Sequence, residues 1–320
     1  MAAESRHTRR WALRGGLTLL AGVAGGATAV PSAVAQPSGS AGTAAEPQVF
    51  GTERWLAREP AEPVDVASYP PSYIVVHHTV NPGNNSDFTR RHAFRISRSI
   101  QDFHMDSRGW IDSGQQFTIS RGGHITEGRH RSLEILRGGR HHVVGNNVGG
   151  HNDEVIGIEN EGDYRTEDVP DRLWSSLCDL VTYIADRYGI PPERIAGHRD
   201  FNTTACPGDV LYARLDELRA EVGRRLGRPV RGRPARSEWP LLRPGDQGEQ
   251  VRVAQRLLRD HGARDVEPDG VFGEVTRDAV VELGRRYGAE TATCCGSTHG
   301  DEPGMLGADL WPKLAGSPRM

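Results

Sequence analysis

The sequence is nearly free of lysine: Lys313 is the single lysine among 39 basic residues, and all the others are arginine. Because 42 acidic residues bring the formal net charge to −3, the chain lacks the strong basic excess of a nucleic-acid-binding protein. After the first 35 residues it also lacks the apolar run of roughly 20 residues that a membrane-spanning helix needs. These absences argue against nucleic acid as a partner and against a permanent membrane anchor, and we expect a monomer.

Cysteine is also scarce, with four residues in the chain. Cys294 and Cys295 are neighbours, which is an awkward geometry for a mutual disulfide, and Cys178 falls within a predicted helix. Cys206 belongs to a candidate metal site described below. The spacing therefore argues against the two disulfides that four cysteines in an exported chain would otherwise suggest.

The first residues have the features of an export signal. Arg9-Arg10 begins a basic patch, residues 15–29 are apolar and small, and residues 33–35 offer a cleavage site before Gln36. We therefore expect a signal peptide over residues 1–35 and a secreted protein, extracellular or associated with the cell wall. The paired arginines fit a twin-arginine signal and an ordinary secretory signal equally well.

Composition divides the remaining chain into two domains and two linkers. Residues 36–63 begin with a stretch rich in Pro, Ser, Gly and Ala and are expected to form a disordered linker. Residues 224–237 include six arginines and no acidic residue, which is typical of a solvated linker; contact with anionic wall polymers is the alternative. These two segments delimit domains at residues 64–223 and 238–316.

The first domain has the pattern of a mixed α/β fold, a central β-sheet flanked by helices. Three apolar runs suit strands, at residues 73–77, 116–120 and 155–161. Ser86-Asp87 is expected to cap a helix that reaches about residue 105. Between Pro170 and Gly189 the apolar residues recur at helical spacing, which predicts an amphipathic helix with a defined start and stop.

Three residues of this domain are candidate zinc ligands. Zinc catalysis needs three neutral or anionic ligands that leave a fourth position for water, and mixed His and Cys sets serve well. His77 ends a predicted strand in "VVHHT", and "GHRDFNTTACPG" places His198 and Cys206 on one loop. Spacing alone does not establish a metal site, because isolated histidines and a cysteine before Pro-Gly are commonly structural.

Four ordered motifs carry a resemblance to a known family. "YIVVHHTV", "IQDFHMDSRGWIDSGQQFTISRGGHITEGR", "VIGIENEG" and "GHRDFNTTACPGDVL" follow the order found in the zinc amidases related to peptidoglycan recognition proteins and phage-type amidase lysozymes. The similarity covers residues 72–223. It implies that His77, His198 and Cys206 bind Zn²⁺. Because family members that lack this cysteine usually bind peptidoglycan without cutting it, Cys206 favours an enzyme.

The chain departs from the family at the residue expected to transfer protons. Gln115 stands where the animal amidases have tyrosine, and a glutamine cannot act as a proton donor or base. Related bacterial amidases carry a glutamate after "GI" in the central strand, which here is Glu159, so we predict Glu159 as the general base. Glu161, two residues on, is the alternative.

Further positions match the family with less defined roles. Thr204 resembles a hydrogen-bond donor to the oxyanion, with stabilisation of the loop as the alternative. Asp200 and His78 are interpreted as supporting the ligands, since metal-bound imidazoles need oriented partners, or as structural residues. Asn147 stands where many relatives have a histidine in the substrate groove. Fold-supporting roles are expected for His104, Trp110, Asp112 and Arg129, and groove-lining, surface or second-metal roles are open for His141, His142 and His151.

The second domain resembles the small three-helix peptidoglycan-binding domain found beside many wall hydrolases. The matching segments are "LRPGDQGEQVRVAQRLLRDHG" and "PDGVFGEVTRDAVVELGRRYG", in which Thr276 is expected to cap a helix. The insert at residues 289–304, with Cys294 and Cys295, departs from the usual short connection before Trp311.

The resemblance implies zinc-dependent hydrolysis of the amide bond between N-acetylmuramic acid and L-alanine, with peptidoglycan as the partner. A protein of the same fold that binds peptidoglycan with little or no activity is the alternative, which Gln115 favours and Cys206 opposes. A zinc peptidase that cuts within the stem peptide is a third hypothesis, and the "GHRDFNTTACPG" block argues against it.

Overall fold

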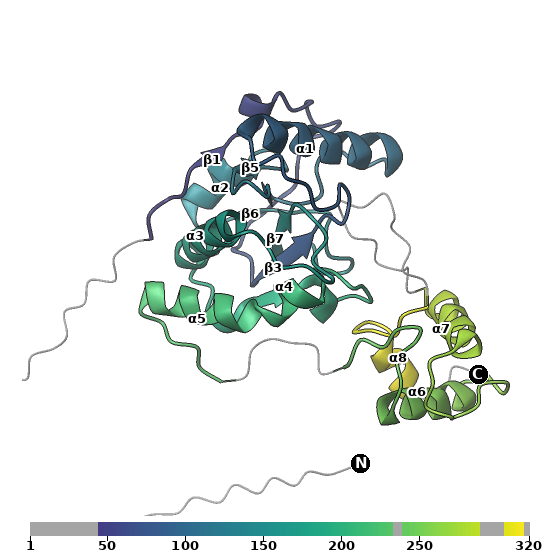
Figure 1. The fold of residues 1–320 in the computed structure, drawn as a ribbon. Coiled ribbons are helices and arrows are strands. Elements are labelled where there is room, and N and C mark those ends of the chain that lie inside the picture. The colour runs from purple at the N-terminus through teal and green to yellow at the C-terminus, as the bar shows by residue number, and fades with distance from the viewer. Residues whose placement is uncertain (1–43, 233–238, 289–303, 317–320) are drawn as a thin grey trace, which may run out of the picture. The chain divides into compact units, whose positions relative to one another are not determined.

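A six-stranded mixed β-sheet forms the centre of the first domain in the computed structural model, which describes residues 44–232, 239–288 and 304–316 (Figure 1). The strand order is β1-β5-β4-β7-β3-β8, and all neighbours are parallel except β4 and β5. The strands are β1 (Val49–Phe50), β3 (Tyr73–His78), β4 (Phe117–Ile119), β5 (Ile125–Glu127), β7 (Val155–Asn160) and β8 (Ile195–Gly197). The predicted mixed α/β fold is confirmed, and β2 (Val66–Ala67) and β6 (His142–Val143) add a small antiparallel pair.

The register of β3 and β7 decides which side chains share a face of the sheet. His77 lies opposite Glu159 in this parallel pair, and successive side chains of a strand alternate between faces. His77 and Glu159 therefore project from the same face, whereas His78 and Asn160 project from the other. Val75 and Val155 lie on the His77 face and form a small buried cluster with Val148.

Helices cover both faces of the sheet. The main core lies between the sheet and α2 (Ser132–Gly138), α3 (Asp171–Tyr188) and α5 (Leu215–Leu226). On the opposite face α1 (Arg90–Asp102) packs against β5, where Ser97 hydrogen bonds to Thr126 at 2.8 Å. As predicted, α3 ends at Gly189, which adopts the left-handed conformation (φ 69°) that glycine permits. The short elements are η1 (Thr52–Trp55), η2 (Phe103–Ser107), η3 (Pro192–Arg194), η4 (His198–Asp200) and α4 (Asp209–Ala213).

The prediction of a disordered linker over residues 36–63 is wrong for residues 44–63. Phe50 and Trp55 are buried, and the Trp55 indole N–H donates to the Glu127 backbone carbonyl at 2.9 Å. β1 pairs with the edge strand β5, so this segment closes one edge of the sheet. Its low apolar content misled the prediction, because two well-placed aromatic side chains suffice to hold it.

Two further boundaries differ from those expected. The cap of α1 is Thr89, whose side chain accepts a hydrogen bond from the His92 N–H, and Ser86-Asp87 lies before it. The linker does not start at residue 224, because α5 continues to Leu226 and Arg225 forms a 2.6 Å ion pair with Asp179 of α3. The expected signal peptide over residues 1–35 lies outside the described residues.

The second domain contains the three predicted helices α6 (Glu249–Asp260), α7 (Glu274–Tyr287) and α8 (Trp311–Ala315). Its core includes Phe272 and Trp311 together with the apolar faces of the helices. Gly273 is the residue before α7, and Thr276 lies inside the helix, where it hydrogen bonds to Gln255, so the predicted cap is wrong. Cys294 and Cys295 lie outside the described residues.

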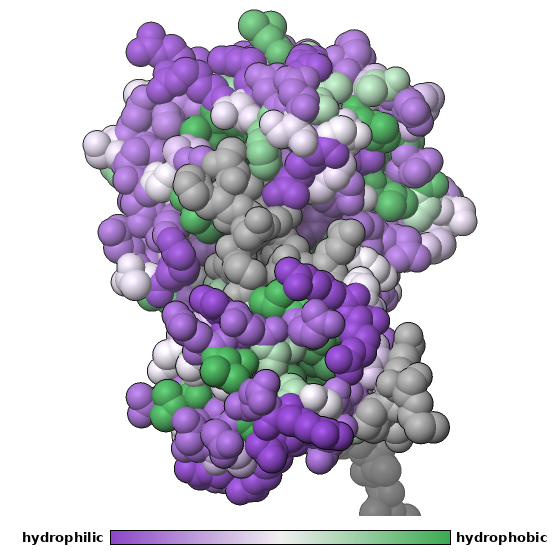
Figure 2. All heavy atoms as spheres, turned by 90° about the vertical axis from the view of Figure 1, so that its right-hand side faces the viewer, coloured by the Kyte–Doolittle hydropathy of each residue, from purple (hydrophilic) through white to green (hydrophobic). Residues whose placement is uncertain are grey.

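The surface is largely hydrophilic on the face drawn in Figure 2, where hydrophobic side chains form small separate spots. Seven large hydrophobic residues of the described chain are exposed: Leu56, Tyr69, Val230, Trp239, Val253, Val271 and Val275. None of the described helices has the length and apolar character needed to cross a membrane.

Candidate metal centre

Three predicted ligands meet at the ends of adjacent strands. His77 lies in β3, His198 follows β8 directly as the first residue of η4, and Cys206 lies on the loop after it. One donor atom from each of the three residues lies within 4.8 Å of the others. His77 Nδ1 is 3.7 Å from Cys206 Sγ, and the centroids of the two imidazole rings are 4.5 Å apart. All three side chains are buried.

The geometry and protonation of this group fit zinc. Zinc–ligand bonds of about 2.0–2.3 Å at tetrahedral angles place neighbouring ligand atoms roughly 3.4–3.6 Å apart, close to the observed separation of His77 and Cys206. Burial lowers the pKa of His198 to about 4 and holds that of His77 well below its ordinary value. Both imidazoles are therefore neutral at pH 7, the form that binds metal. His198 Nδ1 is buried and has no hydrogen-bond partner among the described residues.

The loop that carries His198 and Cys206 folds back on itself. The Arg199 N–H donates to the Cys206 carbonyl at 3.0 Å, and the Cys206 N–H donates to Thr204 Oγ1 at 3.1 Å. This hydrogen bond contributes to the fold of the loop. The Asp200 carboxylate accepts from the Gly197 N–H and the Tyr212 hydroxyl, so Asp200 fixes the backbone at η4.

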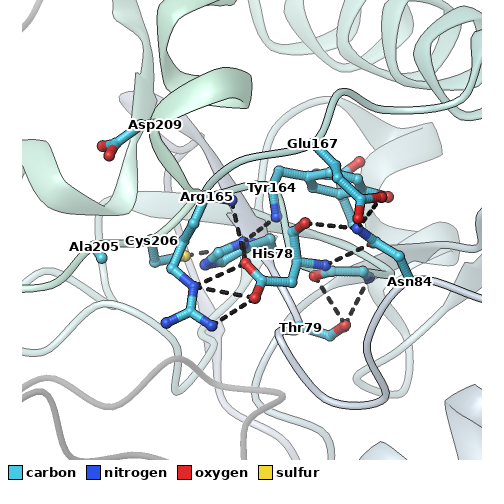
Figure 3. A network of polar contacts seen from close by, with 12 residues as sticks. His78, Thr79, Asn84, Tyr164, Arg165, Glu167, Ala205, Cys206 and Asp209 are labelled. Carbon is cyan, nitrogen blue, oxygen red and sulfur yellow. Dashed lines mark hydrogen bonds and ion pairs between the residues drawn. The ribbon is translucent and has the colours of Figure 1, made fainter.

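His78 supports the centre from the opposite face of the sheet (Figure 3). Its backbone N–H donates to Cys206 Sγ at 3.4 Å, and its Nδ1 accepts from the Tyr164 N–H at 3.1 Å. Burial lowers the pKa of His78 to about 3, although the Asp163 carboxylate opposes this shift. His78 therefore links the Cys206 thiol to the chain after β7 as a neutral imidazole.

The low pKa of His78 makes folding stability depend on pH. A histidine in the unfolded chain has a pKa of about 6.5. The neutral His78 therefore contributes its full share of the folding free energy above about pH 6.5, and this share is lost as the pH falls towards the folded pKa of about 3. We expect His78→Asn, which keeps an acceptor for Tyr164, to weaken the acid dependence of the metal-free protein by up to about 1.4 kcal/mol per pH unit. Urea unfolding at about pH 7 and about pH 5 would measure this, and equal slopes in both proteins would contradict it.

The two candidate bases have different surroundings. Glu159 is fully buried beside His77, in the register described above. Glu161 is also buried, but its carboxylate accepts from His92 Nε2 at 2.6 Å, from Asn85 Nδ2 at 2.7 Å and from the Arg121 N–H at 2.9 Å. Glu161 thus ties α1 and the chain before it to the end of β7.

Gln115 is buried close to the Glu159 strand. Its Nε2 donates to Thr118 Oγ1 at 2.8 Å, and Thr118 is the register partner of Glu159 in β4. A glutamine here holds the neighbouring strand in place.

The remaining predicted residues support the fold. His104 Nδ1 accepts from the Gly114 N–H at 3.0 Å, and its ring packs on Trp110. Asp112 accepts from Gln101 and from the Ser113 and His130 N–H groups, and Arg129 donates to the Ser113 carbonyl. His141 is exposed, His142 is buried and His151 pairs with Glu154. Within the described ranges, no second group of three potential ligands includes any of these histidines.

Sequence reasoning missed two asparagines beside the histidine ligands. Asn202 Oδ1 lies 3.1 Å from His198 Nε2, and the Asn147 side chain lies near the His77 ring. Asn147 drew notice only as a departure from the groove histidine of relatives. For Asn202 the available signal was its position four residues after a predicted ligand on the same loop.

The mixed sheet and its buried His-His-Cys group define an α/β protein with a metal site suited to zinc. The chain belongs to the N-acetylmuramoyl-L-alanine amidase family, whose model matches residues 67–209 and whose members include the peptidoglycan-recognition proteins. A peptidoglycan binding domain matches residues 247–293.

Relatives from animals share about three tenths of the aligned sequence. Peptidoglycan-recognition protein SC2 of Drosophila simulans is 30% identical over 51% of this chain and 82% of its own length. Peptidoglycan-recognition protein LB of Drosophila melanogaster is 31% identical over 50% of this chain, and the N-acetylmuramoyl-L-alanine amidase of Homo sapiens 31% over 62%. The alignments span 64% and 33% of those two proteins. The match to the solved structure of wild-type Drosophila PGRP-LB covers 53% of this chain and 92% of the PGRP-LB chain, with 29% sequence identity and a TM-score of 0.47.

Proposed function

We propose that this protein hydrolyses the amide bond between N-acetylmuramic acid and L-alanine in peptidoglycan. The observation that carries the proposal is the buried cluster of His77, His198 and Cys206 in a chain of the amidase family. A protein that only binds peptidoglycan would not require two neutral imidazoles and a thiol clustered as a complete set of metal ligands. Three protein ligands also match the open coordination of catalytic zinc sites.

The chemistry of the proposed reaction needs an electrophile, a base and a proton donor. Zinc, when bound by these three residues, supplies Lewis-acid polarisation of the scissile carbonyl and lowers the pKa of water. Glu159 lies beside His77 on the same sheet face, where its carboxylate takes the proton of the attacking water and delivers it to the leaving L-alanine nitrogen. The Thr204 hydroxyl accepts from Cys206, which leaves its own proton to donate to the oxyanion.

Glu159 is preferred over Glu161 as the base because of the hydrogen bonds each makes. Hydrogen bonds from His92, Asn85 and the Arg121 N–H occupy the Glu161 carboxylate and give it a structural role. If Glu161 acted as the base, it would have to break these hydrogen bonds, which also hold the chain before α1 in place. Glu159 is the register partner of a metal ligand, so its position is set by the strand ladder.

The second domain is proposed to hold the enzyme on its polymeric substrate, which the match to a peptidoglycan binding domain supports. A catalytic domain tethered to the polymer is exposed to a high local concentration of the amide bonds that it is proposed to cut. An exported protein of this kind acts outside the cell, on the wall or associated with it, in keeping with the expected signal peptide.

Digestion of purified peptidoglycan tests the proposed reaction. We expect new L-alanine amino termini without new reducing sugar ends, both quantified by chemical labelling of the soluble products. New amino termini within the stem peptide would instead indicate a peptidase. Sedimentation with insoluble peptidoglycan and no release of new ends would support the alternative of a binding protein, which the Gln115 departure favours.

A further inference from the structure

We propose that Asn202 is a positioning residue that holds His198 in one tautomer, with the proton on Nε2 and Nδ1 directed to the metal. The proposal rests on the metal site of the proposed function. It concerns a side chain that lies behind the ligand and does not coordinate the metal itself. Asn202 has its amide N–H group anchored to the backbone and its oxygen facing the imidazole.

The pair His198 and Asn202 has the clearer geometry. Asn202 Oδ1 lies 3.1 Å from His198 Nε2, and Asn202 Nδ2 donates to the Gly149 carbonyl at 3.1 Å. The contact with Gly149 fixes which end of the carboxamide faces the ring, because a carbonyl oxygen accepts only from the amide N–H. An oxygen therefore faces Nε2, and Nε2 must carry the proton. The lone pair of the neutral ring then lies on Nδ1.

Asn147 occupies a fixed place near the other imidazole but does not repeat this arrangement. Its Nδ2 donates to the Gly114 carbonyl at 2.9 Å and lies 3.3 Å from Gln116 Oε1, and its side chain lies near the His77 ring.

The Asn147 side chain occupies a slot that only glycine neighbours allow. A Cβ atom at Gly157 would collide with Asn147 Oδ1, and one at Gly145 would collide with Asn147 Nδ2. The backbone is held as well, since the Asn147 N–H donates to Asn152 Oδ1 at 2.7 Å. The carboxamide is therefore held in one orientation beside β7.

The acceptor behind His198 is oriented by a second loop, because the Gly149 carbonyl holds the Asn202 amide N–H. A neutral imidazole has two tautomers, and the wrong one presents an N–H to the metal. In a buried site no bulk water offers an alternative partner for that proton, so a fixed acceptor behind the ring selects the binding tautomer in advance.

Histidine tautomers can be measured in the metal-free protein by ¹⁵N NMR of histidine-labelled chain. Assignments would come from His77→Gln and His198→Gln. We expect His198 of the wild type to carry the proton on Nε2. Asn202→Leu should shift His198 to a mixture of tautomers. A proton on Nδ1 of His198 in the wild type would overturn the proposal.

Zinc affinity, measured by competition with a chromogenic chelator, gives a second readout that involves no substrate. Loss of an outer hydrogen-bond partner typically lowers metal affinity about 10–100-fold, and we expect this for Asn202→Leu. Asn84→Leu is the matched control, because it removes a carboxamide that bonds to Asp163 and Arg121 and leaves the affinity unchanged. Unchanged affinity in Asn202→Leu would also refute the proposal.

Asn202→Asp separates the hydrogen bond from simple packing. Aspartate keeps an oxygen acceptor for His198 Nε2 at nearly the same size, so the tautomer and most of the zinc affinity should be retained. An affinity as low as that of Asn202→Leu would show that shape alone matters. Because tautomer and zinc affinity are measured without peptidoglycan, failure of the amidase proposal would leave these results unaffected.

Discussion

Cys206→Ser is expected to abolish both zinc binding and amide hydrolysis. The buried thiol lies 3.7 Å from His77 Nδ1 and is the softest donor of the cluster. A serine hydroxyl remains protonated near pH 7 and its oxygen is held closer to the backbone, so it cannot replace a thiolate. Zinc per chain after dialysis, measured together with the release of L-alanine amino termini, would test this expectation.

Cys178→Ser is the matched control for this experiment. Cys178 is buried in α3 against the main core, and burial raises its pKa to about 11, so it stays a thiol; among the described residues it belongs to no group of three potential metal ligands. We expect this variant to keep its zinc and its activity, although a polar oxygen in the core lowers stability. If Cys206→Ser retained one zinc per chain, Cys206 would have to be removed from the ligand set.

Glu159→Gln should retain zinc and lose most turnover. The amide has nearly the shape of the carboxylate but cannot accept a proton, and general acid–base help is typically worth about 10² to 10⁴ in rate. The expected result is therefore a fall in kcat of that order with normal zinc content. Steady-state hydrolysis of a soluble muropeptide would measure it.

Glu161→Gln separates the base from its neighbour. This variant still accepts hydrogen bonds from Asn85 and the Arg121 N–H but loses the charge that faces His92. Its main effect should be lower thermal stability, with kcat close to that of the wild type. Full activity of Glu159→Gln combined with loss in Glu161→Gln would exchange the two roles.

The spacing of apolar residues predicted the strands and helices whose own sequence marks the buried face. The run from Tyr73 to His77 and the apolar positions between Pro170 and Gly189 each mark a buried face, and β3 and α3 form there. The edge formed by residues 44–55 could not be predicted in this way. Phe50 and Trp55 become core residues only because β5, some 75 residues later in the chain, supplies their partners.

In the candidate site, the ligands could be predicted from local motifs, whereas the side chains behind them could not. The ligand set followed from four motifs in a fixed order, and the structure brings these three residues together. For the side chains behind the ligands the sequence left alternatives open: Asp200 was expected to support a ligand or the fold, and its bonds to Gly197 and Tyr212 fit the second role. The hydrogen bond from Asn202 to the Gly149 carbonyl joins two loops, and no local pattern encodes it.

His77 and Glu159, the proposed ligand and base, are paired across two hydrogen-bonded strands, so their spacing does not depend on the surrounding loops. A ligand and a base held by loops would move with every change of loop length. Here their spacing is set by the ladder between β3 and β7, which no loop interrupts. Substrate choice can therefore be re-engineered in the surrounding loops while the distance between the reacting groups stays the same.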